Sequence, residues 1–131
     1  MLINGIEVTR ALIIRKPWIH LILAGLKIWE MRSTKTKIRG TIALIEQGTG
    51  LIVGLANLTD SLEPLSHSEL MANFDKHKVD YDAMPELAKW RCPWVLENVQ
   101  RIEPTPYEHK VGAVIWGQFG YRKLLYVTAN F

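Results

Sequence analysis

Short apolar runs, separated by proline, glycine or charged residues, constrain the fold of this chain more than any other feature of its sequence. The run at residues 10–15 is rich in β-branched side chains and predicts a buried strand. Because such runs are closely spaced and no long helices alternate with them, the sequence predicts an α+β fold rather than a doubly wound sheet. The expected architecture is a small barrel of mostly antiparallel strands. The other predicted strands lie at residues 28–32, 40–46, 51–59, 92–101 and 112–119, with a last strand or packed tail at 124–127.

Short helices are expected to interrupt this series of strands. A helix is predicted over residues 18–24, because Pro17 suits its first turn and Gly25 supplies the left-handed residue that ends it. Residues 66–69 have the spacing of a capping box and predict the start of a second helix. The remaining predictions for this part of the chain are a helical turn at residues 85–90 and a loop at 76–82.

Length and composition indicate a single globular domain over residues 1–131. Apolar residues make up 48% of the chain and charged residues 22%, a balance that is typical of globular proteins. Cys92 is the single cysteine and cannot form an internal disulfide, which favours a reducing, cytoplasmic location. No apolar run approaches the roughly 20 residues that span a bilayer, so no membrane partner is predicted. Residues 1–10 also lack the apolar stretch of an export signal.

Charge is distributed unevenly along the chain. Residues 10–39 hold eight basic side chains and one acidic one, Glu30, whereas residues 40–108 hold five basic and eleven acidic residues. Such a basic segment is the usual footprint of a polyanion partner, and Trp18 and Trp29 within it offer faces on which bases can stack. The alternative is a solvated surface that the acidic half balances after folding. The sequence leaves both interpretations open.

Common cofactor and catalytic motifs are missing from the sequence. The four histidines have no metal-ligand spacing, and Cys92 has no C-x-x-C partner, so no metal is predicted. Neither a phosphate-binding P-loop nor a dinucleotide fingerprint occurs, and no cofactor is predicted. No G-x-S-x-G nucleophile motif is found either. Cys92 precedes Pro93 in a predicted strand and is expected to be buried and inert.

The densest group of charged residues in an apolar setting consists of Lys27, Glu30 and Arg32. Strand alternation places Glu30 and Arg32 on one face, and Lys27 lies at the turn after Gly25, where alternation need not hold. All three side chains can therefore face one cleft. A carboxylate between two cations stays ionised and fixes both of them, and a lysine in such a site can also transfer a proton. A purely structural ion-pair cluster explains the same pattern.

These residues resemble a known family. The chain from about residue 11 to 120 resembles the activating signal cointegrator homology (ASCH) domain, a relative of the PUA-like RNA-binding barrel. The G-x-K-x-x-E-x-R signature of that family stands at residues 25–32. The other matching positions are the strand at 11–14, Pro17-Trp18 at the start of the helix, Arg39-Gly40 before the next strand, and the segments 54–60, 94–98 and 102–104.

The resemblance implies a small β-barrel with a cleft beside its first helix and a role in binding RNA or another nucleic acid. Some family members are amidohydrolases that remove the acyl group of 4-acetylcytidine. In that branch a threonine nucleophile follows the signature lysine by three positions, but here Glu30 stands at that position. Ser33, Thr34 and Thr36 are nearby hydroxyls, yet none of them occupies the matching place.

Three functions follow from these observations. The first is an RNA- or nucleotide-binding domain, in which the signature cleft receives a nucleotide and basic side chains contact phosphates. The second is a small amidohydrolase on a modified nucleoside, with Lys27 as base or oxyanion stabiliser and Glu30 activating water; whether the chain is an enzyme stays open. The third is a protein-interaction domain that docks a partner through the acidic segment 63–86. The predicted binding residues are Lys16, Trp18, Lys27, Glu30, Arg32, Ser33, Lys35, Lys37 and Arg39.

Overall fold

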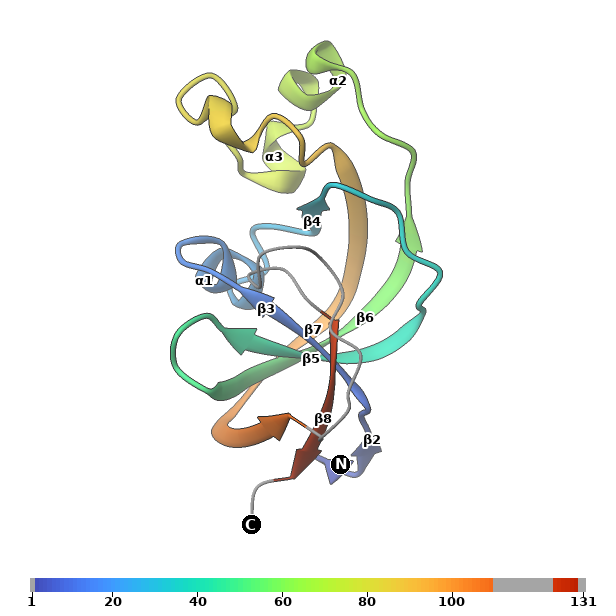
Figure 1. Cartoon of the computed structure of the whole chain (residues 1–131), viewed down its shortest axis with the longest axis vertical. Helices are drawn as coiled ribbons and strands as arrows, with labels where there is room; N and C mark the ends of the chain where they lie inside the picture. Colours follow the sequence, from blue (N-terminus) through green and yellow to red (C-terminus); the bar gives the residue numbers. More distant parts are fainter. Residues whose placement is uncertain (1, 110–123, 130–131) are drawn as a thin grey trace.

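A computed structural model describes residues 2–109 and 124–129 of the chain. In this part, one curled sheet has the strand order β4–β7–β6–β5–β3–β8, and a second pairing joins β7 to β8. The two ends of the sheet therefore approach each other, and the strands curl into a barrel-like shape (Figure 1). The strands are β3 (Arg10–Ile14), β4 (Trp29–Arg32), β5 (Gly40–Glu46), β6 (Leu51–Ser61), β7 (Cys92–His109) and β8 (Leu124–Ala129).

The sheet is mixed, although most of its pairings are antiparallel. β3 and β5 run parallel, with Ala11 opposite Ala43, whereas β5–β6, β6–β7, β4–β7, β3–β8 and β7–β8 are antiparallel. A parallel pair needs a crossover connection, and the helix α1 (Trp18–Leu23) together with β4 lies in that connection. The α+β barrel-like fold predicted from the sequence is confirmed.

The first helix begins and ends where the sequence predicts. Pro17 occupies the N-cap position of α1, and Ala24 is its C-cap. Gly25 follows with a φ of 78°, a left-handed conformation that a side chain would disfavour. Because Gly25 reverses the chain there, residues 26–28 lead directly from the helix into β4.

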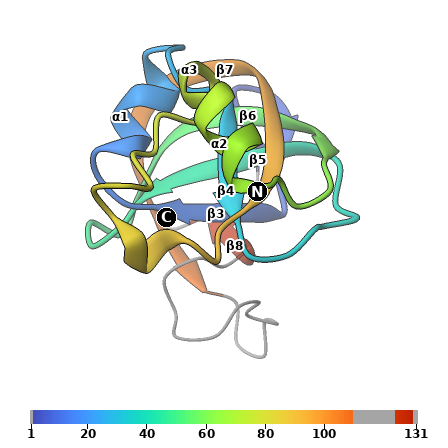
Figure 2. The same cartoon turned by 90° about the horizontal axis from the view of Figure 1, so that it is seen from above.

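The segment between β6 and β7 packs over one end of the barrel, as Figures 1 and 2 show. It contains α2 (His67–Ala72), α3 (Phe74–His77) and the 3-10 helix η1 (Pro85–Leu87). The predicted capping box is present: Ser66 Oγ accepts from the Glu69 amide, and the Glu69 carboxylate accepts from the Ser66 amide.

The prediction of a loop at residues 76–82 is wrong in part. Residues 76 and 77 belong to α3, and His77, Val79 and Tyr81 are buried. The polar residues between them hid this alternation. The Nε2–H of His77 donates to the Leu70 carbonyl, and the His77 Nδ1 accepts from the Val79 amide, so neighbouring polar groups satisfy the buried ring.

Two further elements differ from the expectation. β7 extends to His109 through Pro104 and Pro106, which the sequence predicted to form a connection outside the strand. Pro104 lies where the ladder with β6 shifts register between Arg101 and Thr105, and Pro106 stands opposite Leu51 at the end of that ladder. A small hairpin of β1 (Leu2–Ile3) and β2 (Ile6–Glu7) precedes β3 and was not predicted. The strand predicted at 112–119 lies outside the described residues.

The barrel interior is tightly packed where α1 meets the sheet. Gly54 in β6 has no room for a side chain: a Cβ there would lie 2.5 Å from Leu23 Cδ2 and 2.8 Å from the carbonyl oxygen of Gln100.

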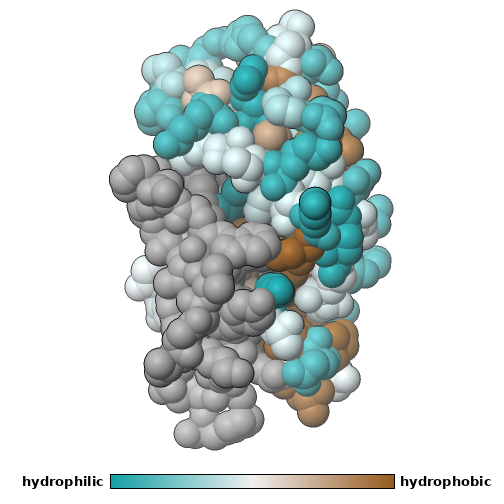
Figure 3. Space-filling model, turned by 45° about the vertical axis from the view of Figure 1, so that its right-hand side comes forward, coloured by the Kyte–Doolittle hydropathy of each residue, from teal (hydrophilic) through white to brown (hydrophobic). Residues whose placement is uncertain are grey.

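The described surface in Figure 3 is mostly hydrophilic over the helical end of the molecule. No helix in the described part of the chain has the length and apolarity needed to cross a membrane.

Candidate functional site

The three charged signature residues meet in one buried cluster. Glu30 and Arg32 lie two residues apart on β4, and Arg32 Nη2 donates to Glu30 Oε2 at 3.0 Å. Lys27 Nζ approaches Glu30 Oε1 to 3.7 Å from the turn that follows α1. The amide of Met31 also donates to Glu30 Oε1 at 3.2 Å. The structure therefore brings together the side chains that the sequence pattern placed around one point.

Burial separates the roles of these three residues. The side chain of Lys27 has no exposed surface, and its ammonium group donates a hydrogen bond to the carbonyl of His77 on α3. Arg32 is 3% exposed and donates to the carbonyl of Ile13 on β3 at 3.2 Å. The two cations thus tie β4 to α3 and β3. Both groups are buried, and the direct contact with a phosphate or base that the sequence predicted for them stays a prediction.

The buried position of Arg32 is only partly compensated by favourable contacts. Burial lowers the pKa of Arg32, whereas the charge and hydrogen bond of Glu30 oppose that change. Its Nε and Nη1 are buried donors without a hydrogen-bond acceptor, and its guanidinium carbon lies 5.6 Å from the ring centre of Trp94. The favourable part of its environment is therefore the carboxylate of Glu30, the Ile13 carbonyl and the Trp94 face.

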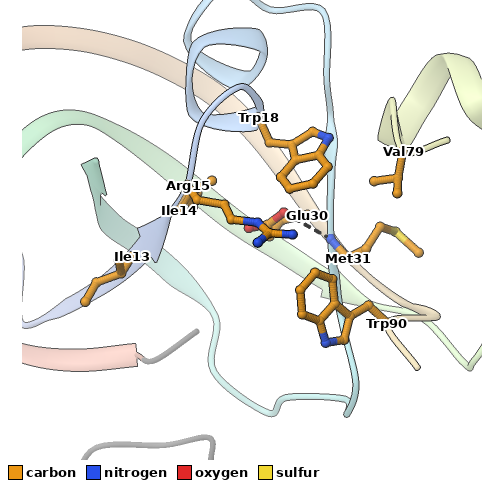
Figure 4. A pocket seen from close by; sticks show the side chains of 8 residues that line it. All are labelled: Ile13, Ile14, Arg15, Trp18, Glu30, Met31, Val79 and Trp90. Carbon is orange, nitrogen blue, oxygen red and sulfur yellow. Dashed lines mark hydrogen bonds between the residues drawn. The ribbon is translucent and has the colours of Figure 1, made fainter. Parts of the chain in front are cut away.

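Of the three, Glu30 is the one that lines a hollow. The hollow lies between β3, the start of α1 and β4, and Figure 4 shows its lining from close by. The wall on the α1 side is Trp18. The opposite wall is Trp90, which lies two residues before the start of β7. The remaining lining residues are Ile13, Ile14, Arg15, Met31 and Val79.

Two lining residues, Arg15 and Trp90, were not predicted from the sequence. Arg15 was read as the charged end of a strand, and Trp90 comes from the helical segment, about 60 residues away from the signature. The predicted stacking residue Trp18 does line the hollow, whereas Trp29 is buried elsewhere beneath Lys76, whose Nζ lies 4.9 Å from its ring centre. No local pattern connects Trp90 to the hollow, since only the fold brings it there.

The basic residues after β4 surround a second hollow, which has a volume of about 520 Å³. Lys35, Lys37 and Arg39 line it together with the hydroxyl residues Thr36 and Ser61. The segment is anchored at its centre, because the Thr36 amide donates to Ser61 Oγ at 3.0 Å and Arg39 Nη1 donates to the Thr36 carbonyl at 2.9 Å. The sequence-predicted cations at these positions are therefore gathered around one concavity.

Acidic residues compensate part of this positive charge. Lys35 Nζ lies 2.5 Å from Glu63 Oε1, and Arg39 Nη2 lies 3.7 Å from Asp60 Oδ1. Lys37 is exposed, and the described residues provide no carboxylate within ion-pair distance of it. The basic segment and the acidic half therefore balance each other in part, which is the alternative that the sequence left open.

The other predicted binding residues lie outside both hollows. Lys16 is exposed and lies 3.8 Å from Glu46 on β5, which also approaches His20 to 3.2 Å. Ser33 is exposed directly after β4.

Cys92 is buried, as predicted, and this burial raises the pKa of its thiol. No group of three metal-ligating side chains converges among the residues that the structure describes.

A third hollow lies within the helical segment between β6 and β7, which carries six of the thirteen acidic residues of the chain. Its volume is about 660 Å³, and both charge signs contribute to it through Asp82, Lys89 and Arg91. The segment itself is part of the core, since Leu70, Leu87 and Trp90 pack against the barrel interior. The segment that the sequence suggested as an acidic docking surface therefore also presents basic side chains, and it is packed against the barrel.

A curled mixed sheet with a parallel β3–β5 pair and a short helix between them defines an α+β, barrel-like domain. The chain belongs to the ASCH domain family, which matches residues 12–106. Its structure is similar to the crystal structure of ASCH from Zymomonas mobilis, with a TM-score of 0.60 and 12% sequence identity over 74% of this chain and 72% of that one. A search of curated protein sequences gives no match. The family resemblance predicted from the signature is confirmed, and the family is generally associated with RNA binding.

Proposed function

We propose that this chain binds RNA, with the basic hollow around Lys35, Lys37 and Arg39 as its phosphate-contacting surface. The observation that carries the proposal is the convergence of these three cations and the Thr36 and Ser61 hydroxyl residues around one concavity of about 520 Å³. Lysine and arginine bind phosphates by charge and by hydrogen bonds, and hydroxyl groups add further donors. The general association of ASCH domains with RNA supports the choice of polyanion.

The two partly neutralised cations fit a phosphate-exchange role. Lys35 and Arg39 pair with exposed carboxylates, and exposed pairs of this kind are weak in water. A phosphate that enters the hollow can take over both cations at low cost. Lys37 supplies a third charge without such competition. A site built in this way attracts RNA and is strongly sensitive to salt.

The signature cluster contributes to binding through Glu30. Lys27 and Arg32 are buried and hold the carboxylate from both sides, so Glu30 alone presents a charged oxygen to the hollow between Trp18 and Trp90. In this proposal Lys27 and Arg32 are positioning residues. Their buried position also weighs against the hydrolase alternative, because Lys27 does not line the hollow and its ammonium group donates to the His77 carbonyl.

The test is binding of a fluorescent single-stranded RNA, measured by anisotropy as a function of salt. The Lys35→Glu/Lys37→Glu double variant is expected to weaken binding by at least tenfold at low salt. Each lost phosphate contact should reduce the slope of log K against log salt by about 0.7. The matched control is Lys89→Glu/Arg101→Glu, which makes the same charge change at exposed positions outside the basic hollow.

Equal binding by the wild type and the Lys35→Glu/Lys37→Glu variant at low salt would contradict the proposal. Equal losses in the test and control pairs would show that net charge, rather than this hollow, attracts RNA. Incubation with 4-acetylcytidine tests the hydrolase alternative separately. We expect no release of cytidine by chromatography, and turnover that disappears in Lys27→Ala would instead assign the signature cluster to catalysis.

A further inference from the structure

The guanidinium group of Arg15 lies between two tryptophan rings. Its Cζ is 5.0 Å from the ring centre of Trp18 and 5.4 Å from that of Trp90. Figure 4 shows the two indoles on opposite sides of the guanidinium, with the Glu30 carboxylate behind it. The guanidinium of Arg15 thus occupies the space between two aromatic walls, which together form a slot.

Both walls are held in place by other parts of the fold. Trp18 begins α1, and its Nε1–H donates to the carbonyl of Lys78 at 3.2 Å. Trp90 is fixed through its backbone: its amide donates to the Leu87 carbonyl at 2.9 Å, and its carbonyl accepts from the Tyr81 hydroxyl. Two walls fixed in this way form a preorganised slot, which is the property that favours ligand binding.

Arg15 itself is held much less firmly. Among the described residues, no carboxylate lies within ion-pair distance of its guanidinium, and its side chain is partly exposed. With Arg15 in place, the remaining cavity is about 10 Å³, which is close to the room that one water molecule needs. The guanidinium therefore fills the slot, and a ligand can enter only when this side chain leaves.

We propose that this slot receives an unpaired nucleobase of the bound RNA and that Arg15 is its displaceable occupant. A guanidinium and a nucleobase are both flat and both stack on indole faces, so one can replace the other between the same walls. The inference rests on the proposed RNA binding and assigns the base-binding part of the same protein. It adds Arg15 and Trp90, which the signature does not contain.

The carboxylate of Glu30, which lines the slot, indicates which bases can bind. An ionised carboxylate only accepts hydrogen bonds and offers about four lone-pair positions. The Glu30 oxygens already accept from the Met31 amide and from Arg32, which leaves acceptor capacity for a ligand. A base that presents an exocyclic amine can donate to it, as adenine, cytosine and guanine do. Uracil lacks that amine and should bind more weakly.

Arg15 also gains a new partner when it leaves the slot. It lies at the end of β3, next to the exposed Lys16, so its long side chain can reach the phosphate of the nucleotide whose base has taken its place. Removal of Arg15 should therefore have opposite effects on ligands with and without a phosphate. A nucleoside gains affinity because it no longer displaces the side chain, whereas a nucleotide loses a charge partner.

The test is isothermal titration of the full chain with adenosine, uridine and adenosine 5′-monophosphate. We expect Arg15→Ala to bind adenosine about three- to tenfold more tightly than the wild type does, without a matching gain for the monophosphate. Trp90→Leu should weaken adenosine binding about tenfold, in line with the loss of one stacking face. Trp90→Phe keeps an aromatic face and is expected to retain most of the binding, and thermal unfolding checks that each variant is folded.

Unchanged adenosine affinity in folded Trp90→Leu, or the absence of adenosine binding in both the wild type and Arg15→Ala, would overturn the slot. Equal affinities for adenosine and uridine would overturn the assignment of Glu30 as the base acceptor. These failures are distinct from a failure of the proposed function. RNA binding that depends on Lys35 and Lys37 but is insensitive to Arg15 and Trp90 would leave the basic hollow intact and remove only the slot.

Discussion

Two groups of cations lie within thirteen residues of each other and have opposite surroundings. Lys27 and Arg32 are buried, and each contacts Glu30 and a backbone carbonyl from another element. Lys35, Lys37 and Arg39 are exposed around a hollow. In the sequence all five are members of one basic segment, and nothing in their residue types distinguishes the two groups.

The comparison shows that burial decides what a charge can do. A buried cation needs its partners and cannot leave them, so it fixes neighbouring elements and a carboxylate in one geometry. An exposed cation makes weak pairs and can exchange them for a phosphate. Charge density along the sequence therefore locates a polyanion surface only after the buried members have been set aside.

Matched replacements of one lysine from each group give the largest expected difference. Lys27→Met leaves the buried network of Glu30 and His77 without its ammonium group and should lower the free energy of unfolding by about 3–5 kcal/mol. Lys37→Met makes the same chemical change at an exposed position and should alter it by less than about 0.5 kcal/mol. Urea unfolding followed by circular dichroism measures both values. Similar small losses for the two variants would contradict a structural role for the buried lysine.

The buried cluster should also make stability depend on pH through His77. Burial lowers the pKa of His77, and the nearby charge of Lys27 acts in the same direction, whereas the hydrogen bond to Leu70 and the charge of Asp75 oppose them. The unfolded state therefore binds a proton at higher pH than the folded state does. Stability should fall as the pH is lowered below about 6.5, the ordinary histidine value, by at most about 1.4 kcal/mol per pH unit.

His77→Gln removes this titration and should flatten the dependence between pH 7 and the lowered pKa. Chemical unfolding at a series of pH values measures the slope. His67→Gln is the matched control, because His67 is exposed and lies 3.7 Å from Asp82 at the surface. A slope that persists in His77→Gln and disappears in His67→Gln would show that His67 causes the pH dependence, and it would contradict this prediction.

The exposed group should show small couplings in the same kind of measurement. The Lys35–Glu63 pair, despite its short distance, is expected to contribute only about 0.2–1 kcal/mol in a double-mutant cycle with alanine replacements. The value should decrease as salt is added, since exposed charges are screened. A coupling above 2 kcal/mol would show that this pair is held as rigidly as the buried cluster, and phosphate exchange would then be disfavoured.

Lys37→Met also tests the difference between the buried and the exposed cations through RNA binding. It should leave stability unchanged but reduce the salt slope of RNA binding by about 0.7, the contribution of one phosphate contact on a single strand. Fluorescence anisotropy over a salt series detects this change. The result that would contradict the division into two groups is an unchanged slope in this variant.

Much of the fold could be predicted because the signals were local. The β-branched run at residues 10–14, the Pro17 and Gly25 boundaries of α1 and the capping box at Ser66 each depend on a few neighbouring residues. The extension of β7 through Pro104 and Pro106 could not be predicted in this way, because it depends on which bonds an irregular ladder leaves unformed.

The candidate site was predictable to a lesser extent. Strand alternation placed Glu30 beside Arg32, and the turn after Gly25 brought Lys27 to them. The extent of their burial was not predictable, because it depends on α3, whose carbonyl at His77 covers the lysine. Trp90 was missed for the same reason: its place in the hollow is a tertiary contact between segments that are distant in the chain.

The hollow takes one aromatic wall from the barrel and the other from the segment that joins β6 to β7. Glu30 belongs to β4, Arg15 directly follows β3 and Trp18 begins α1, whereas Trp90 belongs to the connection between β6 and β7. Loops tolerate changes in length and sequence far better than the strands they join. Replacement of this single connection would therefore change one aromatic wall of the hollow together with the carbonyl groups that hold Lys27 and Trp18.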